Sequence, residues 1–134
     1  MQKQNIIATL VLATIMSVNL SFAQNTANQF DENGKRHGVW KKYYTNQRVR
    51  YVGQFDHGKE VGTFKYYSAA TSDFPIVVRA YNKENDIVDV KFYQENGLLQ
   101  SKGLMKGKKR IGKWFYYHED GKAIMSEENY DDGK

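Results

Sequence analysis

Aromatic residues recur at two fixed places along the chain and are its most conspicuous candidates for binding chemistry. A tryptophan or phenylalanine leads three similar segments, at Trp40, Phe64 and Trp114. A tyrosine follows three residues after the lead position in four segments, as Tyr43, Tyr67, Tyr93 and Tyr117. Rows of exposed aromatic rings can stack on sugar rings or anchor peptide side chains, because aromatic residues dominate many binding surfaces.

Packing is the alternative role for both aromatic rows. Residues three apart on an unbulged strand point to opposite faces of a sheet, so a single sheet would carry aromatic rings on both sides. Truncating a buried tryptophan costs about 3–5 kcal/mol, against a total stability of about 5–15 kcal/mol for a small domain. We therefore expect both rows to pack the core of the repeats.

A run of positive charge is the first candidate interaction site. Anionic lipid or glycan surfaces attract such clusters, and the run would combine with the edge of the tyrosine row. The alternative is a lysine-rich loop that keeps the edge of a sheet soluble. The run consists of Lys106, Lys108, Lys109 and Arg110.

An irregular segment, Ser68 to Pro75, is the second candidate interaction site. Asp73, Phe74 and Pro75 stand there in place of a turn signal. Proline cannot donate a hydrogen bond to a strand ladder, which predicts a loop or the start of an edge strand. Long atypical loops often carry function, although a neutral insertion would look the same.

The titratable residues do not form a catalytic or metal-binding pattern. His37 and His57 each precede a glycine near a predicted turn, and one or both are predicted to be exposed turn residues. His118, Glu119 and Asp120 carry metal-competent atoms, but adjacent residues on a strand alternate between faces. The acidic residues cluster at predicted turns, and the chain has no cysteine, no Gly-x-Ser-x-Gly elbow and no phosphate-binding loop. The sequence therefore predicts a non-enzyme with no catalytic, cofactor-binding or metal site.

Turn signals and repeat spacing predict the elements that carry these residues. Asn33-Gly34, Asn96-Gly97 and Asp120-Gly121, with Asp132-Gly133, are dipeptides typical of two-residue hairpin turns. The lead positions 40, 64, 90 and 114 recur at about 24 residues, with Val90 in the third copy and Val88 in place of its glycine. We predict an all-β array of about four degenerate hairpin units forming an extended twisted antiparallel sheet. Its structural positions are Gly38, Trp40, Tyr43, Gly53, Phe55, Gly62, Phe64, Tyr67, Tyr93, Gly112, Trp114 and Tyr117.

The first residues read as an export signal. Lys3 supplies a positive start, an apolar stretch follows, and Ser21-Phe22-Ala23 resembles a cleavage site. The apolar stretch is shorter than the ~20 residues of a membrane span, which disfavours an anchor. We expect residues 1–23 to be a signal peptide, residues 24–29 a short linker and residues 30–134 the repeat domain. The protein would then be periplasmic or secreted.

The repeat pattern resembles the MORN-repeat variant of many bacterial proteins, which are often labelled YwqK-type antitoxins. The residues that carry this resemblance are Gly38, Trp40, Tyr43, Gly53, Phe55, Gly58, Gly62, Phe64, Tyr67, Gly97, Gly112, Trp114, Tyr117 and Gly121. The resemblance implies a sheet of stacked hairpins that serves as a scaffold for interactions. An exported protein is poorly placed to neutralise a cytoplasmic toxin, so the antitoxin activity is a secondary alternative.

These observations favour an exported, non-catalytic repeat scaffold whose partner is another protein of the cell envelope. Binding to an anionic membrane surface or an envelope glycan is the main alternative, and a hydrolase with an unrecognised site is another. The formal charge of +5 is mild, and export would remove Lys3 from it. No nucleic acid partner is expected, and no cofactor.

Overall fold

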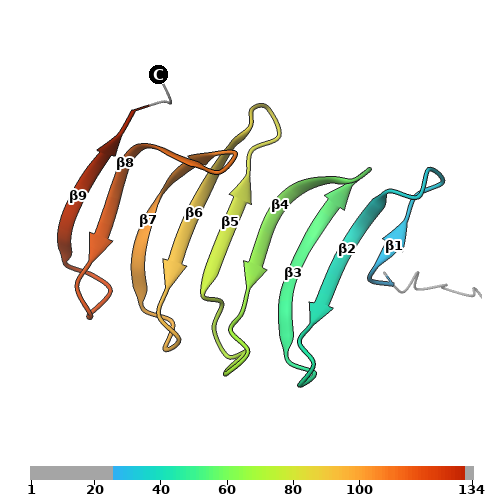
Figure 1. Ribbon diagram of the computed structural model, residues 1–134, viewed down its shortest axis with the longest axis horizontal. Helices are drawn as coiled ribbons and strands as arrows, with labels where there is room; N and C mark the ends of the chain where they lie inside the picture. Colours follow the sequence, from blue (N-terminus) through green and yellow to red (C-terminus); the bar gives the residue numbers. More distant parts are fainter. Residues whose placement is uncertain (1–25, 132–134) are drawn as a thin grey trace, which may run out of the picture.

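A computed structural model describes residues 26–131 as one antiparallel meander. The predicted signal peptide and the Asp132-Gly133 turn lie outside these residues. Nine strands follow one another in chain order across a single open sheet, and the described residues contain no helix (Figure 1). The strands are β1 (Gln29–Phe30), β2 (Arg36–Tyr43), β3 (Val49–Asp56), β4 (Lys59–Tyr66), β5 (Val77–Tyr81), β6 (Ile87–Tyr93), β7 (Leu99–Lys106), β8 (Lys109–Tyr117) and β9 (Ile124–Tyr130). This confirms the predicted all-β hairpin array, and β1 begins with the last residue of the predicted linker.

The turn glycines take the left-handed conformation that the sequence predicts, but mostly in a different kind of turn. Gly34 and Gly97 have φ of 73° and 86° and close three-residue loops, in which their amides bond to Asp31 and Gln94. Gly121 makes the same bond to His118 in a longer loop. The prediction of two-residue turns is wrong there, because a type I turn followed by a left-handed residue uses the same Asn-Gly and Asp-Gly signals.

Two-residue turns do occur between β3 and β4 and between β7 and β8. His57 and Gly58 both have positive φ, at 46° and 88°. Gly107, with φ of 60°, and Lys108 form the other turn. A positive φ is uncommon for a residue with a side chain, so His57 occupies a position that asparagine or glycine would fill more easily.

The lead aromatic row is buried on one face of the sheet, where glycines on neighbouring strands make room for it. Phe64 and Trp114 are 1% and 0% exposed. A Cβ atom on Gly53 would lie 2.2 Å from the Phe64 ring, and one on Gly103 would lie 2.3 Å from the Trp114 ring. Each ring therefore covers a strand at a point where no side chain stands. Trp40, Phe55 and Val90 complete the buried apolar residues of this face.

The tyrosine row does not pack as expected. Tyr43 is 55% exposed, and Tyr67, Tyr93 and Tyr117 are half-buried. The prediction that both rows enter the core is therefore wrong for Tyr43, because a single-layer sheet has no second layer to cover its other face. Gly38, Gly62 and Gly112 lie inside β2, β4 and β8 with φ of 75°, 64° and 62°, so they bend the strands rather than open them.

The chain contains two similar halves that are offset by 50 residues. Trp40 pairs with Gly53 in the first half, as Val90 pairs with Gly103 in the second. Tyr51 pairs with Tyr66, as Ser101 pairs with Tyr116. We refer to β2–β5, residues 36–81, as the first half and to β6–β9, residues 87–130, as the second half.

The connections gather at two opposite ends of the sheet (Figure 1). The upper end holds the turns at residues 31–35, 57–58, 82–86 and 107–108. The lower end holds the loops at residues 44–48, 67–76, 94–98 and 118–123. The basic run therefore lies at the upper end and the Ser68–Pro75 segment at the lower end, so the two candidate interaction sites do not form one surface.

Candidate functional site

A hollow of about 540 Å³ opens at the upper end of the aromatic face. Its volume lies within the range of sites that bind small molecules or single side chains, roughly 300–1,000 Å³. The start of β4, the end of β5, the start of β6 and the end of β7 each contribute to its lining. The lining residues are Lys59, Glu60, Arg79, Tyr81, Asn82, Asn85, Asp86, Ile87, Val88, Val90, Met105, Lys106 and Gly107.

Charged and phenolic groups border the apolar floor of this hollow. Burial raises the pKa of Tyr81 well above its ordinary value, and the nearby Glu60 carboxylate raises it further. Tyr81 therefore stays a neutral hydroxyl that can donate or accept a hydrogen bond. The guanidinium of Arg79 lies 5.6 Å from the centre of the Tyr66 ring, while its buried Nε has no hydrogen-bond partner among residues 26–131.

The structure divides the predicted basic run between two roles. Lys106 lines the hollow, and Lys108 and Lys109 are exposed at the β7–β8 turn. Arg110 instead lies on the aromatic face, with its guanidinium 4.5 Å from the centre of the Trp114 ring. Its Nη1 donates to the hydroxyls of Tyr116 at 2.7 Å and Tyr130 at 3.1 Å. Three lysines therefore remain of the predicted four-residue patch.

The second predicted segment is tied to the turns on both sides of it. The Ser68 hydroxyl donates to Glu95 at 2.9 Å, and the Asn46 amide donates to the Ala69 carbonyl at 2.9 Å. Phe74 is 48% exposed, yet its ring covers Gly97, where an added Cβ would lie 2.9 Å away. The loop thus joins the two halves at the lower end. Asp73 and Pro75 lie within this loop.

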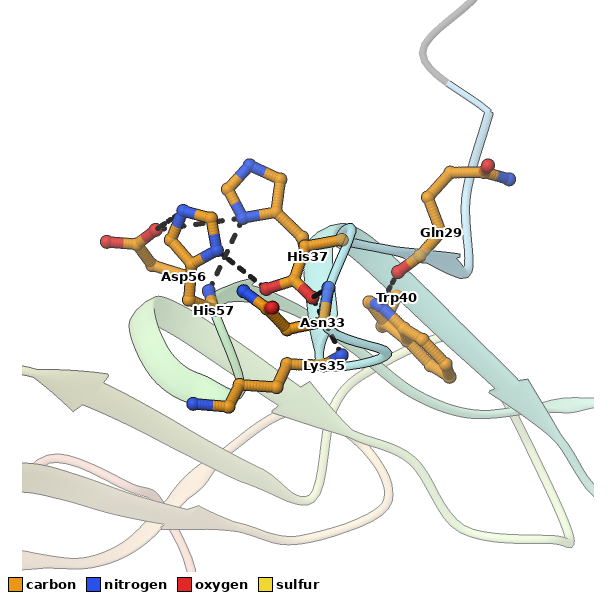
Figure 2. A network of polar contacts seen from close by, with 8 residues as sticks. Gln29, Asn33, Lys35, His37, Trp40, Asp56 and His57 are labelled. Carbon is orange, nitrogen blue, oxygen red and sulfur yellow. Dashed lines mark hydrogen bonds and ion pairs between the residues drawn. The ribbon is translucent and has the colours of Figure 1, made fainter.

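A second polar group at the upper end brings the two histidines of the first half together. The His37 and His57 rings lie 4.5 Å apart between their centres, and the Asp56 carboxylate faces both (Figure 2). Asp56 Oδ1 is 3.7 Å from His37 Nδ1 and 3.7 Å from His57 Nε2. Imidazole nitrogens and carboxylate oxygens are ligands of zinc and related ions. These three residues, with ligand atoms within 4.8 Å of one another, could hold a metal.

Asp31 orients the His57 ring of this group. Its side chain is only 5% exposed, and its Oδ2 lies 2.7 Å from His57 Nδ1. Its Oδ1 accepts the backbone amides of Asn33 at 2.9 Å and Lys35 at 2.8 Å. The bond with Asp31 raises the pKa of His57, and in return the bond with His57 lowers the pKa of Asp31.

Reasoning from single residues treats His37 and His57 as separate turn residues. They are 20 positions apart and meet only because Gly38 pairs with Phe55 across β2 and β3. The strand register could have revealed this pair, because placing Trp40 opposite Gly53 also puts His37 beside Asp56. By contrast His118, the third histidine, is exposed at the lower end, away from this group.

Comparison with known proteins gives no match to a family model, to a curated protein or to a solved structure. The resemblance to the MORN-repeat variant therefore remains a prediction. Within residues 26–131 no helix is long and apolar enough to cross a membrane.

Proposed function

We propose that this protein is an exported, non-catalytic repeat scaffold of the MORN-variant type that binds another protein of the cell envelope. The hollow at the upper end is the observation that carries this proposal. The sheet uses its lead aromatic row for packing, so the row is not free to bind a ligand. The hollow is lined by Val88, Val90 and Met105, with cations and carboxylates around them.

Such a lining suits a peptide segment that places an apolar side chain on the floor and a carboxylate or carbonyl at the rim. Lys59 and Lys106 supply the positive charge that such a carboxylate would pair with. Most of the energy would come from the apolar side chain, as in other protein interfaces.

A matched pair of substitutions tests the proposal. Val88→Trp fills the hollow, whereas Val78→Trp adds the same bulk to β5 on the opposite face. Each variant and the wild type capture partners from envelope extract, and the captured proteins are quantified by mass spectrometry. We expect a partner that Val88→Trp loses and Val78→Trp retains. Equal capture by both folded variants would contradict the assignment to the hollow.

Binding to an anionic surface is the second candidate, supported by the exposed Lys108 and Lys109 beside Lys106. A charge mechanism weakens steeply between low and physiological ionic strength, because exposed charges are screened over about 8–10 Å. Sedimentation with phosphatidylglycerol vesicles at both ionic strengths, with wild type and Lys108→Ala/Lys109→Ala, distinguishes it. Salt-sensitive binding that is lost in the double variant would favour the surface over a protein partner.

A further inference from the structure

We propose that His37, Asp56 and His57 form a binding site for a divalent transition-metal ion, with zinc as the reference ion. None of these three residues lines the proposed peptide hollow, but the site adjoins it, because a neighbouring hollow lined by His37 and Asp56 shares Glu60 and Tyr81 with it. His37 Nδ1, Asp56 Oδ1 and His57 Nε2 are the expected ligand atoms (Figure 2). Two imidazoles and one carboxylate match three-ligand zinc sites, in which water takes the fourth position.

The three ligand atoms are close enough to converge on one ion. With bonds near 2.1 Å, tetrahedral ligand atoms are about 3.4 Å apart. Asp56 Oδ1 lies 3.7 Å from each imidazole nitrogen, and all three atoms lie within 4.8 Å of one another, so closure needs shifts of up to about 1.4 Å. All three side chains are at least 48% exposed and have room to make them. The ion would replace one long hydrogen bond, from the His57 amide to His37 Nδ1 at 3.3 Å.

The support beneath the site is what separates it from a chance surface cluster. Metal-bound histidines commonly use their other ring nitrogen to bond a carboxylate, which fixes the ring. Asp31 does this for His57, and its own side chain is only 5% exposed and is held by two backbone amides. Nδ1 of His57 is thereby occupied, and Nε2 is directed toward Asp56.

Two further observations concern the turn at His57 and the equivalent corner of the second half. His57 adopts φ of 46°, a conformation that is uncommon for residues with a side chain and that often accompanies a functional role. The equivalent corner of the second half carries Ile87, Lys106 and Gly107, a set that offers no ligand pair.

Calorimetric titration of the purified protein with zinc chloride tests the site. We expect one ion per chain and a loss of affinity of at least tenfold in His57→Asn. Asparagine suits this variant because it tolerates positive φ and so retains the turn. Asp31→Asn, which would not touch the ion, should weaken binding by about 10–100-fold, as expected for a group that supports a ligand.

His118→Gln is the matched control, because His118 is also an exposed histidine but has no second histidine beside it. Its affinity should equal that of the wild type. Circular dichroism establishes that each variant retains the sheet before titration, and His37→Gln replaces His57→Asn should the latter unfold. The proposal is overturned by no zinc binding at 1 mM, or by equal affinity in the wild type and the folded variant, whether His57→Asn or His37→Gln.

Discussion

The two halves of the sheet pack in the same way, but the positive and negative side chains of one half stand in the opposite order in the other. In the first half, Glu60 on β4 lies near Tyr66 and Tyr81, with Arg79 on β5. In the second half, Arg110 occupies the position of Glu60, and Glu128 occupies that of Arg79. The tyrosines are kept, as Tyr116 and Tyr130. Opposite charges around a tyrosine pair are therefore retained while their order along the chain is reversed.

This exchange shows which features belong to the scaffold and which are free to change. The rings of Phe64 and Trp114, and the glycines beneath them, occupy the same places in both halves. The upper turns differ more, with Asp56-His57 in the first half and Lys106-Gly107 in the second. Both proposed sites lie at this end, and the three ligand residues of the histidine site are exposed and lie outside the buried core.

The largest expected effect concerns the buried aromatic ring of each half, and it tests whether both halves depend on that ring to the same extent. Phe64→Ala and Trp114→Ala should each lower the free energy of unfolding by about 3–5 kcal/mol, because both rings are buried. Urea denaturation measures the loss, with exposed Met125→Ala as a control expected to cost under about 0.5 kcal/mol. A folded Trp114→Ala protein with an unchanged melting curve would show that the second half does not depend on its ring.

A smaller loss is expected at the glycines beneath the rings. Gly53→Ala and Gly103→Ala should each cost about 1–3 kcal/mol, since the new methyl group collides with a ring that has no space to move. Thermal unfolding measures both. Combining Gly53→Ala with Phe64→Leu should recover part of the loss if the cause is steric. An additive loss in this double variant would contradict the steric account.

Reversing the charges of the first half should sharpen the comparison further. Glu60→Arg and Arg79→Glu should each cost about 0.5–1 kcal/mol, because each places like charges around Tyr66 and Tyr81. The double variant reproduces the order found in the second half and should unfold close to the wild type. Chemical denaturation of the four proteins gives the coupling energy. Zero coupling would mean that the two polar networks are not equivalent.

The smallest effect concerns acid. Hydrogen bonds from Tyr130 and then Tyr116 lower the pKa of Glu128 below its ordinary value of 4.5. Its contribution to stability is therefore present above pH 4.5 and is lost as the pH falls through the lowered pKa. Between pH 6 and pH 3, the melting temperature of Glu128→Gln should fall by less than that of the wild type. Identical losses would show that this carboxylate does not contribute to acid sensitivity.

Much of the architecture follows from the sequence because glycine positions and ring spacing are local signals. The 50-residue offset between Gly53 and Gly103 predicts the repeated register, and each turn glycine within residues 26–131 has the expected positive φ. Turn type was less predictable, since Gln47 takes the left-handed position in a loop with no glycine signal. The exposure of Tyr43 depends on whether a second layer exists, which spacing alone does not reveal.

The candidate sites were harder to predict because they depend on pairs of strands. Charge density at residues 106–110 marked the upper end, but only the structure separates Arg110, which lies on Trp114, from the three lysines. The histidine corner needs the β2–β3 register and the orienting role of Asp31, and these involve residues up to 26 positions apart. Local reasoning correctly places His37 and His57 near turns and does not show that they meet.

We propose that binding chemistry lies where the upper turns of the two halves differ, and not in the packing they share. Nuclear magnetic resonance of ¹⁵N-labelled protein during a zinc titration tests it most directly. We expect shifts of amide signals at residues 31–37 and 56–58, with the signals at residues 86–87 and 106–108, which correspond to 36–37 and 56–58, unchanged. Equal shifts at both corners, or shifts centred on His118, would contradict it.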